Sequence, residues 1–153
     1  MPTRKISGLL WARPCPRPKV IPRAKAKTGT KAQGLGYEKK LVKVLPVGHH
    51  GQWFEFEDAN GRGFCQPDYF FPHPGRIVVV EAKLSWTQAA VIQLEDLYSP
   101  ILAKVYGLPV QNVVICKILR RDAPLPLLFP SLDLALAANL PLSLVHWLGS
   151  GPL

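Results

Sequence analysis

The stretch that decides the fold is RIVVVEAK, residues 76–83. Its run of four β-branched residues, 77–80, favours a central strand that is covered on both faces. Because side chains alternate along a strand, Glu81 and Lys83 are expected on one face, at the end of that strand. Burying charged groups there is costly unless a partner compensates them, so this strand end is the first candidate for a functional site.

Sequence patterns on both sides of this strand predict its neighbours. Before it we expect a helix over residues 37–45, a strand over 52–57, a hairpin turn over 58–61 and a second strand over 63–71. After it we expect a helix over 87–106 that Pro100 kinks or splits, a strand over 110–119, a short helix from Ser131 to Asn139, and a further helix starting at Pro141.

This order of elements predicts an α/β fold with a small, mixed, twisted sheet, made of a β-meander and an added strand and flanked by helices. The 153 residues have room for one domain. Three segments are expected: a basic, Pro-rich, extended arm over 1–33 that is ordered only by docking, a core over 34–122, and a Leu- and Pro-rich helical tail over 123–153.

The tail holds more leucines than a short helical segment needs on a small sheet. We therefore expect it to form part of a homodimer interface. The alternative is that it covers the second face of its own sheet, and the sequence leaves both open. The longest apolar stretch, 125–148, is interrupted by Pro130, Asp133 and Pro141, so we expect no membrane-spanning helix.

Charge indicates the class of partner. Lys and Arg number 19 against 10 Asp and Glu, a net charge of +9, which favours a polyanion, most simply nucleic acid, and argues against a carrier of cationic ligands. Residues 1–43 hold 12 of these bases and a single acid, Glu38. The arm is expected to bind phosphates without sequence preference, or else to act as a solubilising tail; its Trp11 would stack on a base or dock on the body.

Cysteine and histidine usage argues against a disulfide scaffold or a structural zinc site. The three cysteines lie far apart, no CxxC pair exists, and the histidines have no zinc-site spacing beside a cysteine pair. A reducing, cytoplasmic compartment is expected, and no signal peptide is recognised at the N-terminus.

The candidate site combines two carboxylates and one ammonium. Asp68, preceded by Pro67, lies at the end of the adjoining predicted strand and can reach the face of Glu81 and Lys83. A divalent cation would compensate two neighbouring carboxylates, and Mg²⁺ prefers a few carboxylate oxygens together with water and substrate phosphate. The alternative interpretation is a structural ion pair between these acids and Lys83.

The pattern Pro67-Asp68 followed by Glu81-Ala82-Lys83 resembles the PD-(D/E)xK nuclease superfamily, which includes phage-type Holliday-junction resolvases and RecB-like nucleases. The resemblance covers about residues 35–118 and implies a restriction-endonuclease-like core. It implies that Asp68 and Glu81 bind Mg²⁺ with the backbone carbonyl of Ala82, that Mn²⁺ can substitute, and that Lys83 orients or activates the attacking water.

Two further positions are similar to features of that superfamily. Glu38 fits a glutamate that often comes from the helix before the meander, although a solvated acid paired with a neighbouring lysine explains it equally well. Gln93 and Tyr98 are similar to a Gln and Tyr of RecB-like members, but they stand five residues apart instead of four. Gln93 is either a residue near the scissile phosphate or a plain helix residue. The histidines His49, His50 and His73 are interpreted as surface turn residues.

Together these features predict a Mg²⁺-dependent DNA nuclease, a structure-selective endonuclease of DNA recombination or repair encoded by a phage or mobile element in a bacterial host. The alternative is a basic DNA-binding or virion packaging protein that has a nuclease fold without turnover; an RNA-directed role is a weaker third. The residues expected to contact DNA are Arg13, Arg17, Lys19, Arg23, Lys25, Lys27, Lys31, Lys39, Lys40 and Gln93.

Overall fold

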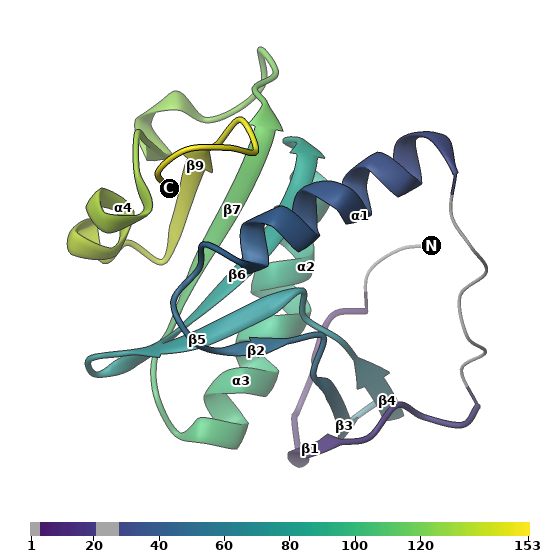
Figure 1. Cartoon of the computed structure of the whole chain (residues 1–153). Helices are drawn as coiled ribbons and strands as arrows, with labels where there is room; N and C mark the ends of the chain where they lie inside the picture. Colours follow the sequence, from purple (N-terminus) through teal and green to yellow (C-terminus); the bar gives the residue numbers. More distant parts are fainter. Residues whose placement is uncertain (1–3, 21–27) are drawn as a thin grey trace.

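The computed structural model describes residues 4–20 and 28–153. It is an α/β fold with a six-stranded mixed sheet and a three-stranded antiparallel sheet, and helices pack against them (Figure 1). The coarse prediction of an α/β fold with a mixed sheet flanked by helices is confirmed. Among the described residues, no helix is both long and apolar enough to cross a membrane.

The predicted central strand lies inside the larger sheet. It is β6 (Arg76–Ser85), antiparallel to β5 and parallel to β7, and residues 77–80 are buried as the β-branched run indicates. The predicted strand over 110–119 is also confirmed. The order across the sheet is β2 (His49–His50), β5 (Tyr69–His73), β6, β7 (Val110–Ile118), β9 (Leu142–His146) and β8 (Leu128–Phe129).

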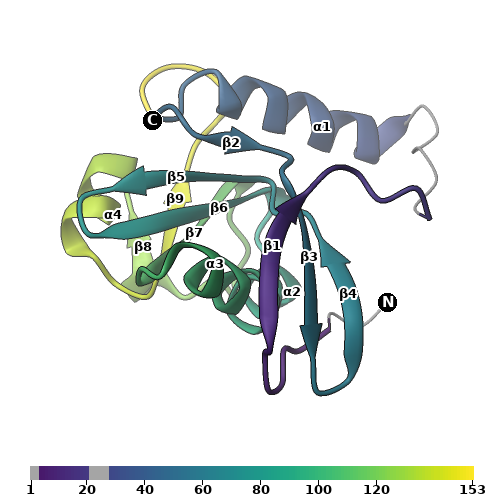
Figure 2. The same ribbon diagram turned by 90° about the horizontal axis from the view of Figure 1, so that it is seen from below.

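Helices cover both faces of this sheet (Figure 2). On one face, Val78 and Val80 pack in a cluster with Tyr37 and Leu41 of α1 (Gly29–Val42) and with α4 (Leu132–Ala138). On the other face, Val79 packs with residues of α2 (Gln88–Gln93), the π-helix η1 (Leu94–Tyr98) and α3 (Ser99–Tyr106). Alternate residues of β6 therefore belong to two separate cores, as expected for a strand covered on both faces.

The predicted helix over 87–106 forms as one continuous helical run over residues 88–106. It is not split at Pro100; its geometry changes earlier, where residues 94–98 form a π-helical segment. Thr87 caps α2 by accepting a hydrogen bond from the backbone N–H of Ala90. Pro100 stands in the first turn of α3, directly after η1, and has no N–H to donate to the turn before it. The backbone carbonyl of Asp96, four residues earlier, accepts instead from the N–H of Ile6 at 2.9 Å. Gly107, with φ of +65°, ends α3 in the left-handed region.

The predicted meander is wrong in one respect, because its strands belong to two sheets. The hairpin of β3 (Trp53–Asp58) and β4 (Gly61–Cys65) forms as expected, with Asp58 opposite Gly61. The second strand predicted over 63–71, however, is two strands, β4 and β5. Pro67 lies between them; its fixed φ and missing N–H interrupt the ladder, so the chain leaves one sheet and enters the other.

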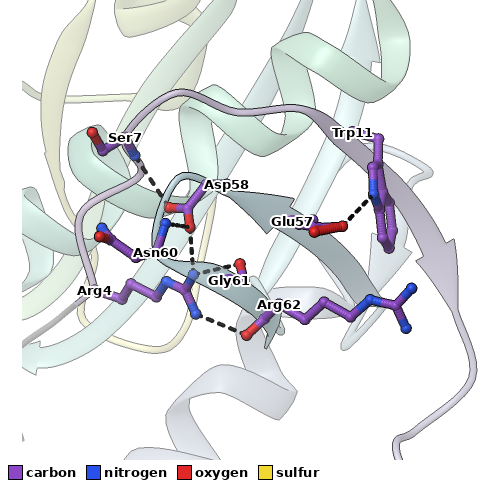
Figure 3. Close-up of polar contacts among 8 residues, drawn as sticks. All are labelled: Arg4, Ser7, Trp11, Glu57, Asp58, Asn60, Gly61 and Arg62. Carbon is purple, nitrogen blue, oxygen red and sulfur yellow. Dashed lines mark hydrogen bonds and ion pairs between the residues drawn. The ribbon is translucent and has the colours of Figure 1, made fainter.

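Part of the predicted arm is built into the fold. Residues Trp11–Cys15 form β1, which pairs antiparallel with β3. Figure 3 shows the buried carboxylate of Asp58 accepting hydrogen bonds from Arg4 and from the backbone N–H groups of Ser7 and Asn60. Trp11 donates from Nε1 to Glu57 at 3.1 Å, so of its two expected roles the structure has it docked on the body.

Helix α1 begins earlier than expected. Thr28 precedes its first residue, Gly29, so the helix starts eight residues before the predicted start at Tyr37 and crosses the expected end of the arm at residue 33. The glycines at 34 and 36 lower helix propensity, which is why the sequence pattern places the start after them. Burial of Tyr37 and Leu41 against β6 compensates for them.

The tail extends the sheet. Helix α4 starts after Ser131, whose hydroxyl accepts from the N–H of Leu134 at 3.2 Å, and it ends at Asn139 with φ of 50°, both as predicted. The helix predicted from Pro141 is wrong, because this segment is a strand, β9, which pairs parallel to β7. The other edge of β9 pairs with β8, a short strand that follows a 3₁₀ turn, η2 (Leu125–Leu127). Leu144 and Val145 are buried on opposite faces, which only a strand allows for adjacent residues.

Candidate active site

A cleft opens where β5 begins, beside the C-terminal half of β6. The last residue pair between these strands joins Tyr69 to Val80, so the register places Asp68, just before β5, beside Glu81. The cleft measures about 250 Å³. Its lining residues come from α1, from the segment before β5 and from the end of β6: Lys31, Gly34, Leu35, Glu38, Asp68, Glu81, Ala82, Lys83 and Leu84. The structure thus brings together the five residues that the sequence predicts for the catalytic and metal site, Glu38 included.

Two contacts hold the carboxylate pair in place. The backbone N–H of Ala82 donates to Oδ2 of Asp68 at 3.0 Å, which ties the segment before β5 to the end of β6. The ammonium of Lys83 lies 3.9 Å from Oε1 of Glu81, so the expectation that these two side chains share a face is met. Glu81 is 3% exposed, whereas the side chain of Lys83 is 39% exposed and can meet a ligand in the cleft.

The electrostatics of Glu81 are unusual for a glutamate. Burial raises its pKa well above the ordinary value, and the neighbouring charge of Asp68 and a hydrogen bond that the two carboxyls share raise it further. Lys83 opposes this shift, and Glu38 adds to it. When Glu81 is ionised, its Oε2 is a buried acceptor without a donor in the described part of the chain. Such an atom requires a proton or a cation.

Glu38 faces this site from α1. Its side chain is 18% exposed and lies 3.6 Å from Nε2 of His50 in β2. His50, Glu38 and Asp68 also line an adjoining cleft of about 260 Å³. The sequence pattern assigns His50 to a surface turn, and no local signal marks it, because its place beside Glu38 depends on how β2 pairs with β5.

The π-helix explains the unusual spacing of Gln93 and Tyr98. In a π-helix the backbone hydrogen bonds join residues five apart, whereas in an α-helix they join residues four apart. Residues 93 and 98 therefore lie on the same side of the helix. Nε2 of Gln93 accordingly donates to the hydroxyl of Tyr98 at 2.7 Å. Burial raises the pKa of Tyr98, and so do the charges of Glu81 and Asp68, which shows that the tyrosine lies close to the carboxylate pair. Gln93 itself does not line the cleft.

The residues expected to contact DNA are spread over several elements. Lys31 lines the cleft, and Lys39 and Lys40 are exposed on α1. Arg13 on β1 is engaged with Glu55 at 2.8 Å and lies over the ring of Trp11. Arg17 and Lys19 are exposed beyond β1, whereas Arg23, Lys25 and Lys27 lie outside the described residues.

The chemistry of the site suits one kind of metal. Within residues 4–20 and 28–153, no group of three or more His, Cys, Asp or Glu side chains is arranged to hold an ion. Two carboxylates beside a backbone segment match Mg²⁺, which takes one or two carboxylates and completes its octahedron with water and substrate oxygens.

No family model, curated protein or solved structure matches this chain significantly.

Proposed function

We propose that this protein is a divalent-metal-dependent nuclease that hydrolyses phosphodiester bonds of DNA, with a restriction-endonuclease-like core. One observation carries the proposal: Asp68 and Glu81 meet at the end of β6, in an open cleft, with the ammonium of Lys83 3.9 Å from Glu81. A structural ion pair with Lys83 does not need a second carboxylate beside Glu81, and the donor-less oxygen of Glu81 favours a cation as its partner.

The residues present fit such an ion. Asp68 and Glu81 would hold it together with the backbone carbonyl of Ala82, and Mn²⁺ could replace Mg²⁺. When bound, the metal supplies neutralisation of charge on the phosphate oxygens and lowers the pKa of a bound water. Glu38, beside the same pair, is available to a second ion.

The side chains of the chain have separable tasks in this proposal. The N–H of Ala82 keeps the Asp68 carboxylate oriented toward Glu81. Burial of Glu81 makes its ionised form depend on a cation, which links metal binding to the charge state of the site. Lys83, partly exposed in the cleft, would orient the attacking water and stabilise negative charge on the phosphate, since its ammonium lies beside the place where that charge develops.

Charge supports DNA as the substrate. Nine of the 19 basic residues fall in the first 33 positions, where there is no acid. The sequence has no recognisable base-reading helix, which favours recognition of DNA structure over sequence. A role in recombination or repair, for a phage or mobile element, fits a chain of this size.

The test is cleavage of labelled junction, flap, duplex and single-stranded DNA by the full chain, with Mg²⁺, with Mn²⁺ and with a chelator. Products should form only with metal. Glu81→Ala and Lys83→Ala should lower the rate by several orders of magnitude, because the group acts as a unit. Glu95→Ala, an exposed acid on η1, is the matched control and should cut normally.

Two outcomes would overturn the proposal. Cutting by Glu81→Ala at the wild-type rate would remove Glu81 from the reaction. Tight binding of all four DNA forms without any cleavage would favour the alternative of a DNA-binding or packaging protein that has lost turnover.

A further inference from the structure

A second pocket adjoins the candidate active site. It measures about 250 Å³ and shares Leu84 with the first cleft, so the two lie on either side of that residue at the end of β6. Its lining comes from α1, from the end of β7 and from the segment after β9: Gln33, Gly36, Tyr37, Lys40, Leu84, Lys117, Leu148 and Gly149.

The charge of this pocket is the opposite of that of the cleft. The first cleft is lined by three carboxylates and two lysines, whereas the second has Lys40 and Lys117 and no acid. Neither lysine has a carboxylate within 4.0 Å in the described part of the chain. Two unopposed ammonium groups at the rim of one pocket attract an anion, and phosphate is the anion that DNA supplies.

The floor of the pocket is apolar and held rigidly. Tyr37 is 4% exposed, its hydroxyl donates to the backbone carbonyl of Trp147 at 2.8 Å, and the two rings lie 5.5 Å apart between centroids. Leu84 and Leu148 complete the apolar lining. Leu148 is 65% exposed at the rim, where it can contact a ligand.

We propose that this pocket anchors one nucleotide of the DNA strand that passes through the active-site cleft. Lys40 and Lys117 hold its phosphate, and Tyr37, Leu84 and Leu148 receive its sugar or base. The pocket, about 250 Å³, is a little smaller than the sites of about 300 Å³ or more that enclose drug-sized ligands, so it has room for part of one nucleotide and not for a longer stretch of strand. The inference rests on the proposed function in one respect, namely that DNA crosses the neighbouring cleft. If it does, the pocket fixes how far the cut bond lies from the anchored nucleotide.

The test measures binding without cleavage. The full chain is titrated with a short fluorescein-labelled single-stranded DNA and with the matching duplex, in chelator, over a range of salt. The double variant Lys40→Ala/Lys117→Ala should bind roughly tenfold more weakly at low salt, and the slope of log affinity against log salt should fall by about 1–2 units. Lys43→Ala, at the C-cap of the same helix and outside both pockets, is the matched control for charge and should change the slope by less than 1 unit.

A second variant and a competitor test the apolar floor. Leu148→Glu places an acid beside the two lysines at an exposed position, so it should weaken DNA binding while the melting temperature is unchanged. A deoxynucleoside monophosphate should displace the labelled DNA from the wild-type protein more effectively than inorganic phosphate does, and this advantage should vanish in the double variant.

The outcomes separate this inference from the proposed function. Wild-type affinity and salt slope in the double variant, or an equal loss in Lys43→Ala, would overturn the anchor and leave cleavage untouched. Loss of binding in the double variant of a chain that never cuts DNA would support the anchor while the nuclease proposal fails.

Discussion

At Glu81, burial and a neighbouring carboxylate act in the same direction. Its pKa in the folded, metal-free protein lies well above the ordinary value of 4.5. The folded state therefore holds a proton more tightly than the unfolded chain does, and the stability linked to this group is present below about pH 4.5 and is lost as pH rises through the higher native pKa.

This linkage makes Glu81→Gln a stabilising change. In chelator at neutral to alkaline pH, the variant should be more stable than the wild type, because the neutral amide avoids the buried charge that the wild type must carry once Glu81 ionises. Urea melts across the pH range measure it, and the advantage should shrink toward acid pH. Adding Mg²⁺ should stabilise the wild type and not the variant. Identical pH dependence of the two proteins would contradict the prediction.

Asp58 shows the opposite linkage. Its burial alone would raise the pKa, but the hydrogen bonds from Arg4, Ser7 and Asn60 outweigh this and lower it below the ordinary value of 3.8. The stability that Asp58 contributes is thus present above about pH 3.8 and is lost as pH falls through the lower native pKa. In thermal melts, Asp58→Asn should have a lower melting temperature than the wild type at neutral pH. Its melting temperature should also fall less steeply as the pH is lowered into the acid range. Asp122→Asn, at a side chain 68% exposed, should show neither change.

The π-helix places Gln93 and Tyr98 on one side of the helical run, where their side chains form a hydrogen bond. Tyr98→Phe removes the partner of Gln93 without changing the packing of the ring, so it should cost about 0.5–1.5 kcal/mol of unfolding free energy. The change is measured by urea unfolding. Tyr106→Phe, at an exposed ring on α3, is the matched control and should be neutral. Equal effects at both positions would mean that the hydrogen bond contributes nothing.

The basic arm is expected to add to DNA binding by the whole molecule. The structure shows that this contribution cannot be tested by simply deleting the arm. Deleting residues 1–33 would remove β1, the Arg4–Asp58 pair and the first turn of α1, together with Lys31 of the cleft. Replacing the five bases between residues 17 and 27 by Gln leaves these elements in the chain. If about three to five of them meet duplex phosphates, the salt slope should fall by about 3 to 4.5 units, at about 0.9 per contact. An unchanged slope would make the segment a passive connection.

The homodimer expected from the tail stays a prediction. Much of the tail is used within the chain, because Leu132, Leu136 and Leu144 are buried. Leu125, Leu134 and Leu148 remain exposed, and the first two lie outside the pocket beside Tyr37, so they can meet a second copy. Light scattering at micromolar concentration should give twice the chain mass of 16.9 kDa if they pair two copies, and Leu134→Glu should then halve it. A mass of 16.9 kDa for the wild type would show that the tail serves only its own sheet.

Local sequence patterns were sufficient to predict an element wherever the residues of that element determine its secondary structure. The β-branched run predicts β6, Asp58 to Gly61 predicts the hairpin, and Ser131 predicts the start of α4, because steric preference, turn geometry and capping act over a few residues. The alternation of side chains along a single strand, also a local property, predicts that Glu81 and Lys83 share a face in the cleft. The juxtaposition with Asp68 was predictable only because the two strands are joined by a short turn.

Contacts between residues distant in sequence determined the elements and side-chain positions that local patterns did not predict. The segment 142–146 became a strand because the edge of β7 was open to it, and Trp11–Cys15 became a strand because β3 offered another edge. His50 reached Glu38, and Lys117 reached the pocket of Lys40, through the same kind of long-range placement. A strand's hydrogen bonds are made with another strand and not within itself, so its sequence indicates that it can pair but does not identify the edge it will meet.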